Sequence, residues 1–212
     1  YANRRGLLYD FSLLGRYLVA VVLYPTPRQS TPEEVVVDTL RIDNLGVAGS
    51  LKRVDACLDS RGSGRPLQIN FVNVSSVNHA RRDVRFRKAI NQSALNLPEG
   101  ATVRRAAWFL GTPLRQRVDR SIFLPRLCNL LSRRGSKVFL LVQDGGDART
   151  LQTEWGLQFP DLQVVASESL KAESQIATTV ATRVRESGAD VLITGLPSPL
   201  QEIWLAEHAP SL

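Results

Sequence analysis

The residues best suited to chemistry stand at four junctions where an apolar segment gives way to a turn and then to a helical pattern. Glu99 precedes Gly100 at one of them, and its carboxylate could act as a general base or only as a charge that a helix N-terminus stabilises. At another, Gly145-Gly146 could let the backbone approach a phosphate, although a plain tight turn has the same spacing. The other two junctions hold the remaining candidates, Asn73, Gly195 and Gln201.

Short apolar segments that alternate with helical patterns would position these residues. Strands are expected at 67–73, 95–97, 137–142, 163–166 and 190–194. Helices are expected at 50–59, 76–92, 101–110, 121–133, 147–156, 170–188 and 199–207. This alternation is typical of a parallel sheet that is buried on both faces, where ligands bind at the carboxyl ends of the strands. We therefore predict an α/β fold with a Rossmann-like, mostly parallel sheet covered by helices, and with an N-terminal apolar helix.

The N-terminal part of the chain has a different composition from the rest. Residues 7–24 are strongly apolar but are interrupted by Asp10, Gly15 and Arg16, so they are too short and too polar for a membrane span. An interfacial amphipathic helix and a helix packed on the main domain both remain open. Prolines between positions 25 and 32 indicate a stiff linker. We predict that residues 1–36 form the helix and linker and that 37–212 form the catalytic domain.

Composition narrows the class of protein. The chain has 212 residues, 43% of them hydrophobic and 22% charged, which excludes a disordered chain, a collagen and a polytopic membrane protein. The net charge of +7 fits nucleic acid, an anionic membrane or phosphorylated substrates, and equally an arginine-rich proteome. No aromatic stacking platform accompanies the charge, so we expect no nucleic-acid partner. Cys57 and Cys128 lack metal-site spacing and are expected to be buried free thiols.

Two tryptophans and the histidines receive structural interpretations. Trp108 and Trp204 fall in helical patterns, and we expect both to pack in the core. His79 and His208 have no partner at triad or metal spacing, so they are expected at the surface or at helix ends. We predict no metal ion and no cofactor.

Several segments occur in an order that is more informative than any one of them. They are 41–47, 87–100, 111–118, 137–146 and 198–204. The second ends in Pro98-Glu99-Gly100, and the last contains Gln201-Glu202-Ile203-Trp204, the most specific single piece. From about Thr39 to Leu212 the chain resembles the WecG/TagA/CpsF glycosyltransferases, glycosyltransferase family 26. Glu99 stands where the family has the aspartate of a Pro-Asp-Gly motif.

This resemblance implies an activity and a set of roles. It implies inverting transfer of a sugar from a nucleotide-sugar donor, first of all a UDP-sugar, to a polyprenyl-diphosphate-linked acceptor in cell-surface or exopolysaccharide synthesis. It also implies peripheral association with the cytoplasmic face of the cell membrane. Glu99 matches the catalytic base, and Asn73 and Gln201 match polar residues that line the donor site. Gly145, Gly146 and Gly195 are expected to bind substrate at the turns that hold them.

The chain departs from the family pattern at several positions. Phe71 replaces a threonine, Glu99 replaces an aspartate, and 120–122 replace a Gly-x-Asp segment. These departures leave open an alternative, a degenerate transferase domain that acts as a binding or scaffolding module in a polysaccharide-synthesis fusion. Residues 1–14 resemble the C-terminal tail of polyprenyl-phosphate sugar phosphotransferases, which predicts fusion to such a priming enzyme. Family members continue past the position of Leu212 into a C-terminal appendage, which we expect to be absent.

Overall fold

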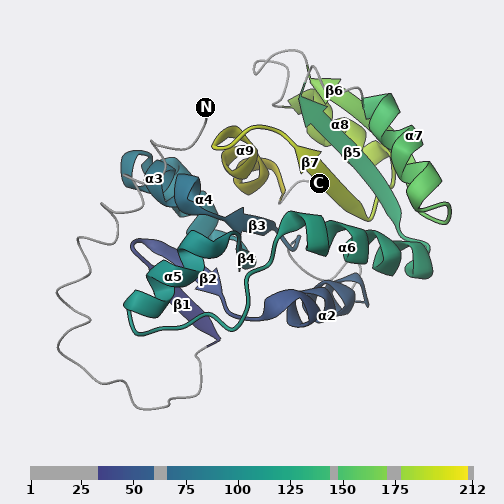
Figure 1. Cartoon of the computed structure of the whole chain (residues 1–212). Coiled ribbons are helices and arrows are strands. Elements are labelled where there is room, and N and C mark those ends of the chain that lie inside the picture. The colour runs from purple at the N-terminus through teal and green to yellow at the C-terminus, as the bar shows by residue number, and fades with distance from the viewer. Residues whose placement is uncertain (1–32, 60–65, 144–147, 171–177, 210–212) are drawn as a thin grey trace, which may run out of the picture. The chain divides into compact units, whose positions relative to one another are not determined.

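The computed structural model describes residues 33–59, 66–143, 148–170 and 178–209 (Figure 1). Two compact units divide the chain, one comprising Tyr1–Ser50 and Ile69–Arg120 and the other Leu51–Gln68 and Ser121–Leu212. The predicted apolar helix at 7–24 lies outside the described residues. The predicted division at residue 36 stays a prediction. No described helix is long and apolar enough to cross a membrane.

The first unit opens with an antiparallel hairpin of β1 (Glu34–Val37) and β2 (Leu40–Asp43). Asp38 turns the chain with φ 58°, a left-handed conformation that aspartate tolerates better than most residues. Alternate residues of both strands are fully buried, which gives the hairpin one core face. The sequence pattern did not predict this hairpin, because strands of four residues are too short to show a clear alternation of apolar and polar positions.

A parallel pair of strands follows, β3 (Ile69–Val72) and β4 (Leu95–Pro98). They are connected through α3 (Val74–Arg82) and α4 (Val84–Gln92), and β4 leads into α5 (Ala101–Phe109). Every residue of β4 is buried, and Asn96 within it donates its backbone N–H to the Asp43 carboxylate at 2.6 Å. This contact links the parallel pair to the hairpin. The predicted strands at 67–73 and 95–97 are confirmed.

The single basic helix predicted at 76–92 is wrong, because Asp83 divides it into α3 and α4. Asp83 has an extended backbone, with φ −123° and ψ 110°, and so ends α3. Its carboxylate accepts the backbone N–H groups of Arg85 at 2.8 Å and Phe86 at 3.2 Å and so caps α4. Aspartate is among the preferred residues at a helix N-cap. The basic residues on both sides of Asp83 hid this break in the sequence.

The second unit contains a three-stranded parallel sheet in the order β6-β5-β7. The strands are β5 (Lys137–Gln143), β6 (Gln163–Leu170) and β7 (Val191–Gly195). Phe139 and Leu141 point from one face of β5 into a cluster with Val184 and Trp204, while Val138 and Leu140 are buried on the other face. The central strand is therefore covered on both sides, as a parallel sheet requires. The unit contains α7 (Ala148–Gln158), α8 (Thr178–Glu186), α9 (Leu200–His208), part of α2 (Gly46–Asp59), and α6 (Arg120–Arg134) except for Arg120, which belongs to the first unit.

Three expectations about these elements need correction. The strands of the described residues form three sheets, one of them antiparallel, where we expected one mostly parallel sheet. The helix predicted at 170–188 does not include Leu170, which ends β6; its described part is α8 (Thr178–Glu186), and 171–177 lie outside the described residues. Trp108 is 62% exposed, since α5 turns Val103, Ala106 and Ala107 inward and leaves position 108 outside. Trp204, at 4% exposure, is in the core as expected.

Candidate functional site

Asn73 and Glu99 lie together in the first unit because each directly follows one of two paired parallel strands. Asn73 comes after β3 and Glu99 after β4. The backbone N–H of Glu99 donates to the Val72 carbonyl at 2.9 Å and extends the strand pairing by one residue. The side-chain Nδ2 of Asn73 then donates to Oε2 of Glu99 at 3.1 Å. Two of the residues singled out from the sequence therefore meet at the carboxyl end of this sheet.

Arg120 binds the same carboxylate through both of its oxygens. Nε donates to Oε1 of Glu99 at 2.6 Å, and Nη2 donates to Oε2 at 2.9 Å. The Glu99 side chain is 16% exposed and that of Arg120 is 57% exposed. Two parallel charge-assisted bonds fix the plane of a carboxylate as well as its position. Glu99 is thus an oriented acceptor that a molecule in solvent can still reach.

The ring of Phe71 lies against Arg120, which binds this carboxylate. The guanidinium carbon of Arg120 lies 5.9 Å from the centroid of the Phe71 ring, within the range of a cation–π contact. Phe71 belongs to β3, and Arg120 is the first residue of α6. The sequence did not identify Arg120 as a site residue, since it stands 21 positions from Glu99 and belongs to no motif. The available signal was that its segment departs from the family pattern together with Glu99 and Phe71.

Asn73 has a second, structural role. Its Oδ1 accepts the backbone N–H of Ser76 at 3.2 Å, and the Ser76 hydroxyl is within 3.2 Å of the Asn73 backbone nitrogen. This reciprocal pair is a capping box at the start of α3. The amide therefore has a defined orientation, with its oxygen on the helix and its nitrogen on Glu99. The cap holds the donor in place for the carboxylate.

Gly100 lets the chain turn sharply from β4 into α5 directly after Glu99. Its φ of 84° is a conformation that favours glycine, and no atom lies within 4 Å of the position that a Cβ would occupy. Its N–H points to Oδ1 of Asp119 at 3.4 Å, and Asp119 pairs with Arg117 at 2.9 Å. A carboxylate near the start of a helix complements the helix dipole.

Gln201 and Gly195 belong to the second unit. Gly195 ends β7 beside Val142 of β5, and a Cβ placed on it would come within 3.4 Å of the Val142 side chain. Gln201 lies in the first turn of α9, where its Oε1 accepts the Thr194 hydroxyl at 2.7 Å. Both residues therefore stand at the carboxyl end of β7. Gly145 and Gly146 lie outside the described residues.

The other residues of the Gln-Glu-x-Trp segment serve the core. Glu202 is 6% exposed, and its backbone carbonyl accepts from Nε2 of Gln68 at 3.4 Å. Trp204 packs in the cluster on β5 and stacks on His208, with 5.0 Å between the ring centroids. This segment thus anchors α9 and presents Gln201 at its start.

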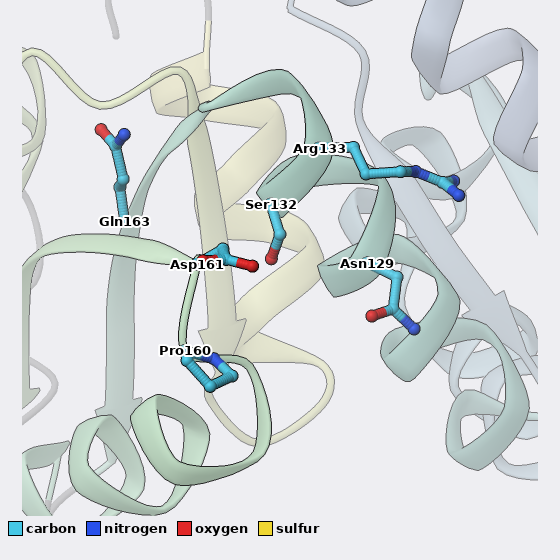
Figure 2. A pocket seen from close by; sticks show the side chains of 6 residues that line it. All are labelled: Asn129, Ser132, Arg133, Pro160, Asp161 and Gln163. Carbon is cyan, nitrogen blue, oxygen red and sulfur yellow. The ribbon is translucent and has the colours of Figure 1, made fainter.

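An open hollow of about 730 Å³ lies at the other end of the three-stranded sheet from Gly195 and Gln201 (Figure 2). It is lined by Asn129, Ser132, Arg133, Pro160, Asp161 and Gln163. Gln163 is the first residue of β6, so the hollow is at the amino ends of the strands. Ligands of open parallel sheets bind at the carboxyl ends, and none of the candidate residues lines this hollow.

The described residues offer little other catalytic chemistry. They include no group of three or more His, Cys, Asp or Glu side chains arranged to hold a metal ion. Cys128 is 1% exposed, and burial raises the pKa of its thiol to about 11. A thiol with that pKa is protonated at neutral pH and is a poor nucleophile. Cys57 is partly buried and is also a free thiol.

Comparison with known proteins identifies one family. The sequence profile described as the glycosyl transferase WecG/TagA/CpsF family matches residues 35–212. This range holds Asn73, Glu99, Arg120, Gly195 and Gln201. None of the curated proteins compared with the chain matches it.

Proposed function

Because the chain belongs to the WecG/TagA/CpsF family of glycosyltransferases, we propose that it transfers a sugar from a nucleotide donor to an acceptor linked to polyprenyl diphosphate. Family membership makes it a glycosyltransferase of cell-surface polysaccharide synthesis. The identity of the donor as a UDP-sugar and of the acceptor as a lipid-linked sugar is our proposal. The observation that supports the proposed sugar transfer is the oriented Glu99 carboxylate at the carboxyl end of β4.

Glu99 acts as the general base in this proposal. A hydroxyl of the acceptor sugar gives its proton to the carboxylate while its oxygen forms a bond to the anomeric carbon of the donor. The bond from that carbon to the nucleoside diphosphate breaks, and the diphosphate leaves with the electron pair. Attack from the face opposite the leaving group inverts the anomeric configuration. Asn73 orients the carboxylate for this step through the hydrogen bond described above.

Gln201 and the glycines are proposed donor-binding residues. Gln201 can donate through its amide nitrogen while Oε1 accepts from Thr194. Gly195 keeps the end of β7 free of a side chain, so that a ligand can approach the backbone there. For Gly145 and Gly146 the proposal of a diphosphate loop rests on the sequence alone.

The outer face of α5 supports the proposal of peripheral membrane association. Trp108 is 62% exposed, and the exposed Arg104 and Arg105 precede it by four and three residues, so all three lie on one side of the helix. A tryptophan flanked by arginines suits the interface of an anionic bilayer. We propose that this face contacts the membrane that carries the acceptor.

Replacing the base tests the proposed reaction. We expect Glu99→Gln to lower kcat by about 10²-fold, because the amide cannot accept the proton, and to leave the Kd of the donor unchanged. The matched control is Glu186→Gln, which changes an exposed glutamate at the end of α8. Turnover is followed as release of the nucleoside diphosphate. An unchanged rate in the Glu99 variant would remove Glu99 from the mechanism.

The same experiment addresses the second candidate function, a degenerate domain that serves as a binding or scaffolding module. Two observations favour this alternative. Arg120 already binds the Glu99 carboxylate, and the large ring of Phe71 lies against Arg120. A scaffold would show no turnover in the native chain under any donor and acceptor pair. Turnover that falls in the Glu99 variant rejects it.

A further inference from the structure

We propose that Arg120 is a positioning residue that clamps the Glu99 carboxylate and, supported by the Phe71 ring, leaves Oε1 to receive the substrate hydroxyl. This inference rests on the proposed function of Glu99 as the base. It adds to that function a residue on which the orientation of the base depends.

Arg120 binds the Glu99 carboxylate with two nitrogens of its guanidinium group. Nε and Nη2 of Arg120 bind different oxygens of Glu99, at 2.6 and 2.9 Å. A guanidinium holds its N–H groups in a rigid plane, so two such bonds fix both the direction and the rotation of the carboxylate. A lysine ammonium would keep the charge but would lose this control of orientation. The clamp therefore depends on the shape of the arginine as well as on its charge.

The ring of Phe71 supports the Arg120 side chain. That side chain is 57% exposed, and a long exposed side chain loses conformational entropy when one orientation is fixed. The Phe71 ring lies 5.9 Å from its guanidinium carbon and offers an aromatic face to the cation. Phe71 lies on β3 and Asn73 directly follows that strand, so one short stretch of chain carries both the support of the clamp and the second donor to Glu99.

The hydrogen bonds that Glu99 already accepts determine which of its oxygens can accept another. An ionised carboxylate can accept about four hydrogen bonds, two on each oxygen. Oε2 accepts from Arg120 Nη2 and from Asn73 Nδ2, while Oε1 accepts only from Arg120 Nε among the described residues. The remaining position is therefore on Oε1. The arrangement assigns the proton transfer to that oxygen, with the clamp still closed.

Turnover of Arg120 variants tests the positioning role. We expect Arg120→Ala to lower kcat by about 10-fold or more with little change in the KM of the donor, since the carboxylate loses its orientation but remains present. Arg120→Lys should be almost as impaired. Added guanidinium at millimolar concentration should restore part of the rate of Arg120→Ala, and it should not help the double variant with Glu99→Gln. Arg82→Gln, at an exposed arginine of α3, is the control.

Phe71→Leu tests the support. We expect it to lower kcat by about threefold and to add nothing when combined with Arg120→Ala, because the ring acts only through the guanidinium. Independent, multiplicative losses in the double variant would show that Phe71 acts by another route and would overturn this part of the inference.

A double-mutant cycle measured by urea unfolding tests the contact between Arg120 and Glu99 without an activity assay. We expect the Arg120–Glu99 pair to show a coupling of about threefold in the unfolding equilibrium constant. Absence of coupling overturns the clamp. Coupling without a loss of kcat in Arg120→Ala overturns the positioning role, as does a rise in kcat, which would make Arg120 a block on the base. If Glu99→Gln retains full turnover, the proposed function fails and the inference fails with it, whatever the Arg120 variants do.

Discussion

At the scale of single residues, Asn73 joins a helix cap to the candidate base. Its oxygen serves α3 and its nitrogen serves Glu99, so substitutions can separate the two roles. Asn73→Ser keeps a good N-cap and so should leave the free energy of unfolding nearly unchanged, but its shorter side chain removes the amide donor from Glu99. We expect kcat to fall by about 10-fold or more.

The matched variant is Asn73→Ala, which loses both roles. It should lower the free energy of unfolding by about 1 kcal/mol and also reduce kcat. Urea unfolding and turnover of both variants provide the measurement. Equal stability losses in the two variants would contradict the capping role, and full activity in Asn73→Ser would contradict the role toward Glu99.

Cys128 makes stability depend on pH in the alkaline range. Burial raises the pKa of its thiol from 9.0 to about 11. Between these pH values the unfolded chain loses the thiol proton while the folded chain retains it, so the free energy of unfolding falls as pH rises. The slope is at most about 1.4 kcal/mol per pH unit.

Comparison with Cys128→Ala isolates this contribution from those of other groups. Between pH 8 and pH 10.5 the native chain should lose about 2 kcal/mol more stability than the variant, as measured by urea unfolding. Parallel pH profiles of the two proteins would show that the thiol titrates alike in the folded and unfolded states.

The residue scale also shows where sequence reasoning stopped. Asn73 and Glu99 could be placed together, because parallel strands bring their carboxyl ends to one edge. Arg120 could not, because its approach depends on the path of the turn between α5 and α6, and hydrophobic periodicity says nothing of that path. Trp108 was misplaced for a related reason, since a short helix can turn a large apolar residue outward when small residues fill its buried face.

At the scale of elements, Asp83 determines that two helices form where the basic pattern predicted one. Its carboxylate caps α4 through the N–H groups of Arg85 and Phe86. Asp83→Ala should lower the free energy of unfolding by about 1 kcal/mol, whereas Asp83→Asn should have little effect because asparagine caps equally well. Urea unfolding of the pair checks this, and identical losses would attribute the effect to charge.

Two of the strands, Lys137–Gln143 and Val191–Gly195, were predicted from continuous apolar runs, which are typical of strands in parallel sheets. The first of them is largely buried, and the second is half-buried. The β1–β2 hairpin and the second half of β6 were missed. Residues 167–169 are polar and half-buried, so their strand conformation depends on pairing with β5 and leaves no apolar signal.

At the scale of the whole molecule, the lipid-linked acceptor that we propose would bring the protein to a membrane surface. The α5 face with Arg104, Arg105 and Trp108 should then contribute to membrane binding. We expect Trp108→Ala and Arg104→Gln/Arg105→Gln each to lower flotation with anionic liposomes several-fold. Leu157→Ala, at an apolar residue of α7 that is 81% exposed, is the control. Undiminished flotation in both α5 variants would place the membrane contact elsewhere.

The most direct test of the central claim is calorimetric titration of the native chain with UDP, GDP and their common sugar conjugates, with uridine as a control lacking the diphosphate. We predict that at least one UDP-sugar binds and that uridine does not. At about 100 times its Kd, that donor should add about 2.7 kcal/mol to the free energy of unfolding and raise Tm measurably. A chain that unfolds cooperatively yet binds none of these compounds would contradict the claim that it uses a nucleotide-sugar donor.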